Sequence, residues 1–491
     1  WSDVVANGVN AQGHRIKGTP KHRNSANYLI INGSSNLETN KTLTKSNSPY
    51  VSLGPTIINP NATLTVEAGV VIKFKDQTNA GLHGNGLIIA YGTEAEPIVF
   101  TSFADDSYAG DTNQNGTSTS AEVGDWGTIK LLKSGSLIDH TIIRYGGGDG
   151  EQANIKVRNA SVDITNSVIE KSKYSGVSLE HAHGNILSNT IQKNAAQNTP
   201  ESVGMMVTDS NLVIRNNTFA ENYNGLVFLY GGGAYDLKVE NNVFTGNVAE
   251  AVRTESINPA FSQNTATGNG INGIVLQGFV MQDYTLTPDI PYVVATNAYT
   301  VNQGKTLTMA PGTIIKSKGN GMMMVSGSLQ AKGTSDHPII FTSIHDDECG
   351  IIGGCGDTDA TSTAPNAGDW NTLWFDQNSG TSTFDYATIR YAGAQNNGAV
   401  HINSLSLVEI KKSIIENNYQ SGMFVDHSSP LISDSLIQNH RVPAGPNQSF
   451  GLFLISSSTP TITNTRFKNN TTHIFNDPTS TSTDAGGNVW E

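Results

Sequence analysis

One stretch of the sequence has the residue types and the spacing of a calcium-binding loop. Asp111, Asn113, Asn115 and Glu122 occupy the fixed positions of the pattern D-x-[DN]-x-[DN]-G-x5-E, and a glycine stands at the sixth position. Oxygen ligands at alternate positions, a sharp turn and a terminal glutamate suit a hard cation. We therefore predict a calcium site formed by Asp111, Asn113, Asn115, Thr117 and Glu122. A solvated turn of Asp and Asn residues is the alternative.

Other acidic residues could complete this site or form a second one, because loops that leave neighbouring strands can converge. In the second acidic segment Gly368 stands where the terminal glutamate would fall, and Asp369 follows one position later. A second site would thus be either rebuilt or lost. The further candidate ligands are Asp105, Asp106, Asp125, Asp346, Asp347, Asp357, Asp359 and Asp369.

Four residues are candidates for catalysis: Glu180, His183, Arg253 and Glu255. Two carboxyl groups on neighbouring segments could serve a glycosidase, which uses one as general acid and the other as general base or nucleophile. His181 and His183 alternate as a metal pair could, but no third ligand is evident. Ordinary surface polar residues are the simpler interpretation. Trp126, Trp370 and Trp374 are candidates for stacking on sugars, and Trp374 is the one that we expect to be exposed.

The sequence contains one long unit twice, and the four catalytic candidates have no counterpart in the other copy. Pro97-Ile-Val-Phe-Thr-Ser returns at Pro338-Ile-Ile-Phe-Thr-Ser, and Gly-Asp-Trp at 124–126 returns at 368–370. Such repeats have to be considered before any other feature. We predict an N-terminal cap at residues 1–28, a first half at 29–275 and a second half at 276–491, continuous with the first.

Short apolar segments bounded by Gly, Asn or Pro run through both halves, as in Leu64-Thr-Val and Val70-Val-Ile. They are typical of short β-strands between turns. Segments such as Asn189-Thr-Ile, Asn217-Thr-Phe and Asn242-Val-Phe recur every twenty to thirty residues or so, a period that indicates the coils of a solenoid. The sequence lacks both the leucine-rich repeat pattern and the propeller signatures.

At these recurring Asn coils the sequence resembles the right-handed parallel β-helix proteins, which include pectate-lyase-like enzymes, phage tailspikes and bacterial surface proteins. The resemblance covers about residues 28 to 491. It implies an all-β parallel solenoid and an asparagine ladder from Asn166, Asn189, Asn217 and Asn242. Polysaccharide lyases of this fold use an Arg or Lys base, often with calcium, and Arg144-Tyr145 and Arg390-Tyr391 occur once in each copy. A surface ladder repeated by duplication is the simpler interpretation of both pairs.

Net charge, apolar content and cysteine usage limit the classes of partner and compartment that we expect for this protein. The formal charge of -13 argues against nucleic acid and anionic membranes, which attract basic surfaces. No apolar run is long enough for a membrane span. Cys349 and Cys355 are either a disulfide, which an oxidising compartment would favour, or two free thiols.

These observations predict an extracellular or cell-surface protein that is structural or adhesive rather than catalytic. A polysaccharide or a cell-surface glycan is the expected partner, and the alternative is a polysaccharide lyase or a glycoside hydrolase. The last residues suggest that a partner covers this end, with Val489 and Trp490 as the docking residues. The partner would be either the next molecule in an end-to-end assembly or a further segment of a longer parent chain.

Overall fold

The structure, a computed structural model, describes residues 27–28, 35–75, 79–194, 202–229, 232, 235–295, 297–350, 354–404, 406–441 and 449–491. Contacts within the chain divide it into a first unit, residues 1–252 with 264–269, and a second unit, residues 253–263 with 270–491. The predicted N-terminal cap lies almost wholly outside the described residues. Two single-turn helices are present in the described ranges, η1 (Lys45–Asn47) and η2 (Ala394–Asn396). No helix in these ranges is long and apolar enough to cross a membrane.

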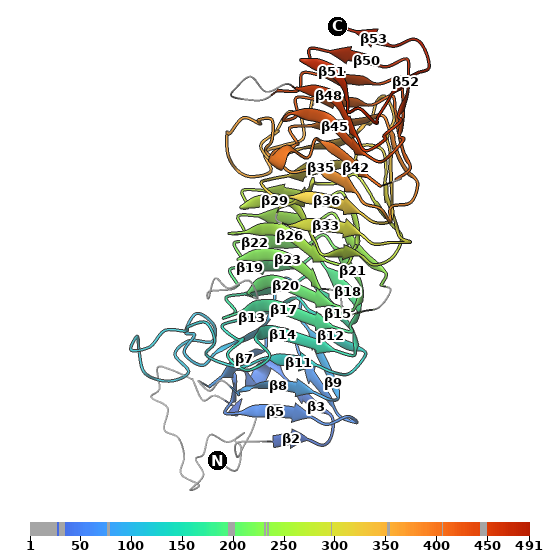
Figure 1. Cartoon of the computed structure of the whole chain (residues 1–491). Helices are drawn as coiled ribbons and strands as arrows, with labels where there is room; N and C mark the ends of the chain where they lie inside the picture. The colour runs from blue at the N-terminus through green and yellow to red at the C-terminus, as the bar shows by residue number, and fades with distance from the viewer. Residues whose placement is uncertain are drawn as a thin grey trace, which may run out of the picture. The chain divides into compact units, whose positions relative to one another are not determined.

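The first unit contains three parallel sheets (Figure 1). Sheet one comprises β1 (Asn27–Tyr28), β4 (Tyr50–Ser52), β7 (Val71–Phe74), β10 (Ile98–Ser102), β13 (Thr141–Arg144), β16 (Val168–Glu170), β19 (Thr190–Gln192), β22 (Thr218–Ala220), β25 (Val243–Thr245) and β28 (Thr265–Thr267). Sheet two comprises β2 (Ser35–Leu37), β5 (Pro55–Ile58), β8 (Gly81–Gly84), β11 (Ile129–Leu131), β14 (Ala153–Arg158), β17 (Ser175–Glu180), β20 (Val203–Thr208) and β23 (Asn224–Leu229). Sheet three comprises β3 (Lys41–Leu43), β6 (Thr63–Val66), β9 (Leu87–Tyr91), β12 (Ser136–Asp139), β15 (Ser161–Thr165), β18 (His183–Leu187), β21 (Asn211–Arg215) and β24 (Leu237–Glu240).

The second unit repeats the three-sheet plan. One sheet comprises β29 (Ile271–Gln277), β32 (Tyr292–Val294), β35 (Ile314–Ser317), β38 (Ile339–Ser343), β41 (Ala387–Arg390), β44 (Ile414–Glu416), β47 (Leu436–Gln438), β50 (Arg466–Lys468) and β53 (Val489–Trp490). Another comprises β30 (Phe279–Val280), β33 (Ala298–Val301), β36 (Met322–Val325), β39 (Leu373–Phe375), β42 (Val400–Asn403), β45 (Ser421–Asp426), β48 (Phe450–Ile455) and β51 (Thr472–Asn476). The third comprises β31 (Tyr284–Leu286), β34 (Thr306–Met309), β37 (Ser328–Lys332), β40 (Ser382–Asp385), β43 (Val408–Lys411), β46 (Leu431–Ser433), β49 (Thr461–Thr463) and β52 (Thr483–Asp484). In addition, β26 (Glu250–Glu255) spans the division, and β27 (Ala260–Ser262) belongs to the second unit.

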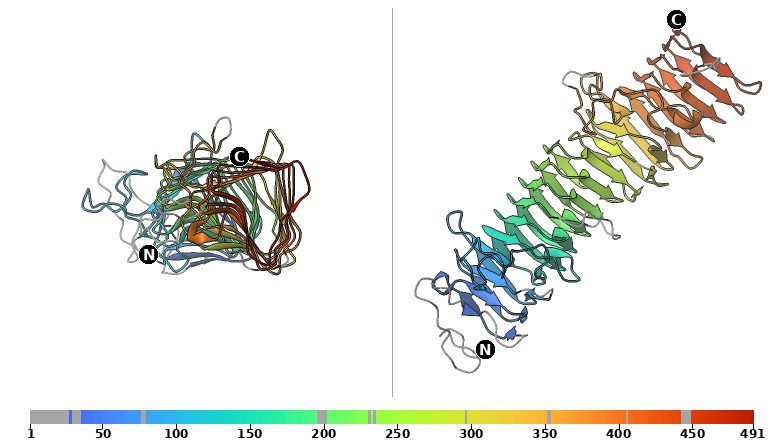
Figure 2. Two further views of the ribbon diagram at one scale, coloured as in Figure 1. Left: turned by 45° about the horizontal axis from the view of Figure 1, so that its top comes forward. Right: turned by 90° about the vertical axis from the view of Figure 1, so that its left-hand side faces the viewer.

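Strands of successive turns pair in parallel within each unit, as Figure 2 shows. In the first unit β10 lies between β7 and β13, and in the second β38 lies between β35 and β41. Side chains alternate along each strand, so that Leu64 and Val66 of β6 are buried while Thr63 and Thr65 are only partly buried. Because the strands pair in register, residues of the same type lie above one another in successive turns. The ring of Phe219, for example, stacks on the ring of Phe244 with centroids 5.0 Å apart. The predicted all-β parallel solenoid is confirmed.

An asparagine ladder lines one corner of the first unit, but it does not include Asn166. The side-chain nitrogens of Asn189 and Asn217 each donate to the side-chain oxygen of the next asparagine at 3.0 Å, and the column continues through Asn242. Ser167 takes the ladder position one turn earlier, because its backbone nitrogen binds Asn189. Asn166 lies one residue too early and binds Asp139 instead. The sequence prediction was therefore wrong for this residue. A second ladder, which the sequence did not suggest, comprises Asn194, Asn222, Asn247 and Asn269.

Candidate functional site

The predicted calcium loop lies in the segment that connects β10 to β11 in the first unit. Lys73 of β7, which is fully buried, donates hydrogen bonds of 2.8 Å to the carbonyl oxygens of Asp105 and Gly110. Burial lowers the pKa of Lys73, and the charges of Asp105, Asp106 and Asp111 oppose this shift. A buried cation thus fixes the base of the segment.

Three of the predicted calcium ligands gather at one turn of this loop. The carboxylate of Asp111 accepts hydrogen bonds from the backbone nitrogens of Asn115 (3.2 Å) and Gly116 (2.9 Å). The side-chain oxygen of Asn113 also accepts from the Asn115 nitrogen, at 3.3 Å. The side-chain oxygen of Asn115 is buried and has no hydrogen-bond donor among the described residues. An oxygen in this state is suited to a cation.

The two other predicted ligands, Thr117 and Glu122, are exposed. Within the described ranges, no three His, Cys, Asp or Glu side chains lie close enough to hold a metal ion. The predicted set contains two such side chains, Asp111 and Glu122, and its other ligands are amide and carbonyl oxygens. Calcium therefore stays a prediction, which the loop pattern and the unpaired oxygen of Asn115 support.

A hollow of about 480 Å³ opens beside this loop. It is lined by Lys75, Phe103, Ala104, Asn113, Ser118, Thr119, Ser120, Glu122 and Asp125. Phe103 supplies an aromatic surface, and most of the other residues supply hydroxyl, amide or carboxylate groups. Two of them, Asn113 and Glu122, are predicted calcium ligands. The hollow and the predicted ion site therefore share side chains.

Two of the three further acidic candidates of the first unit, Asp105 and Asp125, have hydrogen-bond partners within the chain. Burial acts to raise the pKa of Asp105, but hydrogen bonds from Ser107 and Thr101 and the charge of Arg144 leave this pKa below its usual value. The carboxylate of Asp125 accepts hydrogen bonds from the hydroxyl of Ser102 (2.5 Å) and the backbone nitrogen of Glu122 (3.0 Å). Asp106 acts on the buried Lys73 through its charge. Asp105 and Asp125 therefore have partners in the chain, whereas one carboxylate oxygen of Asp106 is buried and has no hydrogen-bond donor among the described residues.

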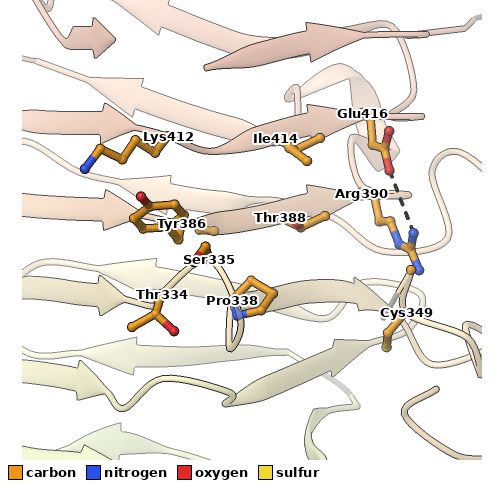
Figure 3. Close-up of a pocket in the computed structure, with 12 residues that line it drawn as sticks. Thr334, Ser335, Pro338, Cys349, Tyr386, Thr388, Arg390, Lys412, Ile414 and Glu416 are labelled. Atoms are coloured by element: carbon orange, nitrogen blue, oxygen red, sulfur yellow. Dashed lines mark ion pairs between the residues drawn. The ribbon is translucent and has the colours of Figure 1, made fainter. Parts of the chain in front are cut away.

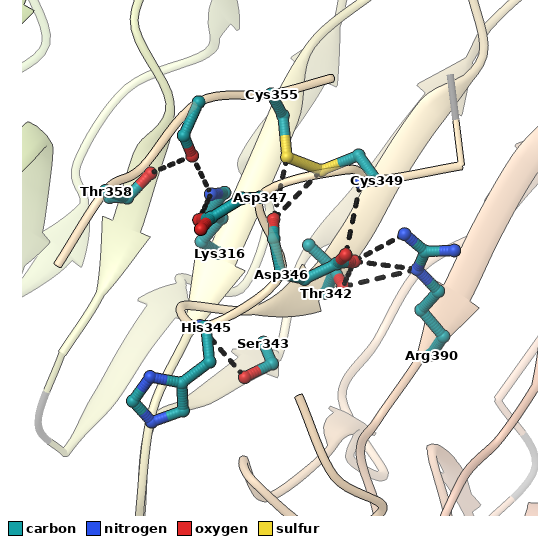
Figure 4. The surroundings of a disulfide bond; sticks show 11 residues. Lys316, Thr342, Ser343, His345, Asp346, Asp347, Cys349, Cys355, Thr358 and Arg390 are labelled. Carbon is teal, nitrogen blue, oxygen red and sulfur yellow. Dashed lines mark hydrogen bonds and ion pairs between the residues drawn. A yellow bond between two sulfur atoms is a disulfide. The ribbon is translucent and has the colours of Figure 1, made fainter. Parts of the chain in front are cut away.

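The acidic segment of the second unit is arranged in the same way (Figure 4). The buried Lys316 donates to the carbonyl oxygen of Gly356 at 2.7 Å and lies 3.8 Å from the carboxylate of Asp347. Burial lowers the pKa of Lys316 to about 8, and charges including those of Asp346, Asp357 and Asp359 oppose the shift.

The carboxylates of Asp346 and Asp369 also have binding partners within the chain. Arg390 binds the carboxylate of Asp346 at 2.6 Å, and the hydroxyl of Ser343 binds Asp369 at 2.6 Å. His345 pairs with Asp359 at 2.5 Å. The chain's own cations and hydroxyls thus contact most of the acidic residues of this segment.

Cys349 and Cys355 form a disulfide in this segment. Both cysteines are buried, and both sulfur atoms face the carbonyl oxygen of Asp346. The backbone nitrogen of Cys349 also donates to the carboxylate of Asp346 at 3.1 Å. The bridge therefore holds the loop over the ion pair between Asp346 and Arg390.

A second hollow lies beside this disulfide (Figure 3). Its lining includes Arg390 and Glu416, whose charged groups are 3.7 Å apart, and the aromatic ring of Tyr386. The ammonium of Lys412 lies 5.0 Å from the centre of that ring. Both a cationic and an aromatic group are thus available to a ligand here. The lining also includes Thr334, Ser335, Pro338, Cys349, Gly350, Ala387, Thr388 and Ile414.

The four candidates for catalysis line neither hollow. Glu180, at the end of β17, pairs with Lys156 (3.1 Å) and Arg158 (3.0 Å). Burial acts to raise the pKa of Glu180, but these two cations lower it overall, which suits a permanent carboxylate and not a general acid. His183 begins β18 and is exposed, and Arg253 and Glu255 lie on β26.

The three tryptophans differ in their surroundings. Trp126 and Trp370 are buried, and each indole nitrogen donates a hydrogen bond of 2.9 Å, to the carbonyl oxygen of Arg144 and of Arg390 respectively. Trp374 is half-buried on the outer side of β39. Its ring stacks on His401, with centroids 3.9 Å apart.

Trp374 begins an aromatic column that sequence reasoning missed. The column comprises Trp374, His401, Phe424, Phe453 and Phe475, on successive strands of one sheet. Neighbouring rings are nearly parallel, with centroids between 3.9 and 5.3 Å apart. Each inner ring thus has both faces covered by its neighbours, whereas sugars stack on a free ring face. The column therefore acts as a structural stack, and the hollow at Phe103 is the better candidate for a ligand.

The strand β53 places Trp490 over Phe467, with ring centroids 4.7 Å apart. Trp490 and Val489 are each 44% exposed. End-to-end association through these residues stays a prediction.

The fold and these sites define the class of protein as a parallel β-helix. The chain matches the family model described as "Right handed beta helix region" at residues 122–282 and 371–486, which is more than half of its length. It also matches "Pectate-lyase like beta helix domain" at residues 35–113 and 278–421. The chain belongs to the right-handed β-helix family. A comparison with curated proteins finds no match.

Several solved structures are similar to this chain. Tailspike protein 3 of bacteriophage CBA120 has a TM-score of 0.35 and 10% identity, over 83% of this chain and 56% of that chain. The catalytic domain of a GH87 α-1,3-glucanase has a TM-score of 0.22 and 13% identity, over 89% and 64%. PfbA, a surface adhesin of Streptococcus pneumoniae, has a TM-score of 0.17 and 12% identity, over 87% and 86%. The chain thus spans less than two thirds of the length of the tailspike protein and of the glucanase domain. Such low similarity carries no argument about function.

Proposed function

We propose that this chain is an extracellular, non-catalytic glycan-binding protein of structural or adhesive type, and that the hollow beside the calcium-type loop binds the glycan. The observation that carries the proposal is the lining of this hollow. Phe103 offers an apolar surface for a pyranose face, and Asn113, Glu122 and Asp125 offer partners for its hydroxyl groups. Calcium bound to Asn113 and Glu122 would fix two of these side chains.

The ion pairs of the described residues favour binding over catalysis. A glycosidase requires a carboxyl group with a raised pKa opposite a second carboxylate. Glu180 has a lowered pKa, and Asp346 is bound to Arg390. Burial raises the pKa of Asp347, but this carboxylate lies 3.8 Å from the buried Lys316 and lines neither hollow. The disulfide between Cys349 and Cys355 suits an oxidising, extracellular compartment.

The test is a screen of plant, algal and bacterial polysaccharides that follows binding together with new reducing or unsaturated ends. We expect binding without new ends, and we expect Phe103→Ala to abolish it. Phe279→Ala, which removes a 49% exposed phenylalanine of the second unit, is the matched control and should bind normally. Equal binding by both variants would contradict the site.

The alternative is a polysaccharide lyase, and one observation favours it. The hollow of the second unit brings together Arg390, Lys412 and Tyr386. A cation can neutralise a uronate and a tyrosine can transfer a proton. Unsaturated ends that form with the wild type and disappear in Tyr386→Phe would replace the binding proposal with this one.

A further inference from the structure

The loop beside the hollow contains a dipeptide that is chemically labile. Asn115 is followed by Gly116, and a glycine leaves its own backbone nitrogen unhindered for attack on the preceding side-chain amide. We propose that Asn115 deamidates spontaneously, so that the amide at the fifth position of the loop becomes the carboxylate of an aspartate.

The surroundings of Gly116 distinguish it from other Asn-Gly pairs of the chain. Apart from Gly116 itself and its two neighbours in the chain, no described atom lies within 4 Å of the place that a Cβ on Gly116 would occupy. At Gly86, after Asn85, that place lies 2.1 Å from a backbone oxygen, and at Gly225, after Asn224, it lies 2.5 Å from one. Ring closure moves the backbone around the glycine, which close packing at Gly86 and Gly225 opposes and the open loop permits.

A proton acceptor is already in place. The backbone nitrogen of Gly116 donates a hydrogen bond of 2.9 Å to the carboxylate of Asp111. This nitrogen must lose its proton before it can attack, and a carboxylate at hydrogen-bond distance can take that proton as a general base. Asp111 thus has two roles in this proposal: it is a predicted calcium ligand, and it is the base that promotes the loss of the side-chain amide of Asn115.

The reaction balances with water as its one co-reactant. The Gly116 nitrogen bonds to the side-chain carbonyl carbon of Asn115, and the bond from that carbon to the amide nitrogen breaks. Ammonia leaves with the transferred proton, and a five-membered succinimide remains. Water then opens the ring and gives aspartate, or isoaspartate when it attacks the other carbonyl carbon.

The change would strengthen the proposed calcium loop, and this consequence depends on that part of the proposed function. Calcium loops gain affinity with the number of charged ligands. Conversion adds a carboxylate where the side-chain oxygen of Asn115 already lacks a hydrogen-bond donor among the described residues. Without calcium, the new charge would repel Asp111.

The experiment is peptide mapping by mass spectrometry of the purified chain during incubation at mildly alkaline pH. We expect conversion at Asn115 to be at least about tenfold faster than at Asn85 and Asn224, and to slow in Asp111→Asn, which lacks the base. Equal rates at the three asparagines would overturn the proposal. Because all three are in one molecule, misfolding of a variant cannot explain such a result.

A calorimetric titration with calcium chloride tests the consequence. Asn115→Asp should bind calcium about tenfold more tightly than freshly purified wild type, and Asn115→Ser should bind more weakly. Equal affinities would overturn the consequence for calcium, while rapid conversion would still establish the labile site. Loss of glycan binding alone would count against the proposed function and not against the deamidation.

Discussion

The ammonium group of Lys73 lies 2.8 Å from the carbonyl oxygen of Asp105, inside a junction between strand and loop that excludes solvent. Lys316 makes the corresponding contact in the second unit, to the carbonyl oxygen of Gly356 at 2.7 Å. In each unit, a buried cation from a strand thus holds an acidic loop against the solenoid.

Replacement of this cation should destabilise the first unit. Lys73→Met leaves carbonyl oxygens and carboxylates without their buried partner, and we expect the free energy of unfolding to fall by about 3 kcal/mol. Lys75→Met, which removes an exposed lysine beside the same strand, should change it by less than about 0.5 kcal/mol. Urea denaturation measures both, and similar losses in the two variants would contradict the role of Lys73.

Removal of calcium should lower the melting temperature of the wild type. An ion that binds the folded state alone stabilises it by mass action, by about 2.7 kcal/mol at a hundredfold excess over the dissociation constant. Asp111→Ala should melt like the chelated wild type and should not respond to chelator. Differential scanning calorimetry with and without chelator tests this, and a wild type insensitive to chelator would remove the ion from the loop.

Acid should destabilise the second unit through its buried histidines. Burial lowers the pKa of His440 to about 3 and that of His401 to about 4. The unfolded chain, with a histidine pKa of about 6.5, binds more protons between these values. The contribution of these histidines to the free energy of unfolding is therefore fully present above about pH 6.5. It is lost as the pH falls toward 4, by up to about 1.4 kcal/mol per pH unit for each histidine.

His440→Asn is the matched variant for this prediction. Asparagines lie on both sides of His440, because the backbone nitrogen of Asn418 donates to its ring and its own backbone nitrogen donates to the side-chain oxygen of Asn470. Urea midpoints at pH 7 and pH 4.5 should differ less in this variant than in the wild type. An identical pH dependence in the two proteins would exclude His440 as the titrating group.

The aromatic column should contribute to stability. Phe424→Ala removes a ring that contacts its neighbours on both faces, and we expect a loss of about 2 kcal/mol because the ring is half-buried. Tyr91→Ala, which removes a 60% exposed aromatic side chain at the end of β9 in the first unit, is the control for an outward position and should be nearly neutral. Equal unfolding curves for Phe424→Ala and the wild type would show that the stack is incidental.

Much of the fold could be predicted from the sequence, because short strands, turn residues and coil-length repeats are local signals. The asparagine ladder was predicted one residue off at one place, since the corner register decides between Asn166 and Ser167. The pattern of a calcium loop can be recognised in the sequence because its candidate ligands are close together, and calcium binding there stays a prediction.

Other parts of the site could not be predicted, because their partners are distant in the sequence. From the sequence of its strand alone, Lys73 would be expected to point outward into solvent. It is buried because the loop that follows β10 covers it and supplies its hydrogen-bond acceptors. Trp374 and His401 become neighbours through the register of β39 and β42 alone. The spacing of two cysteines allowed either a disulfide or free thiols, and geometry decides for the disulfide between Cys349 and Cys355.

The most direct measurement is a crystal structure of the chain with calcium and an oligosaccharide that the screen retains. We expect a calcium ion held by the five predicted ligands, Asp111, Asn113, Asn115, Thr117 and Glu122, and an intact sugar in the adjacent hollow against Phe103. A sugar bound instead between Arg390 and Tyr386 of the second unit, or cleaved there, would contradict it.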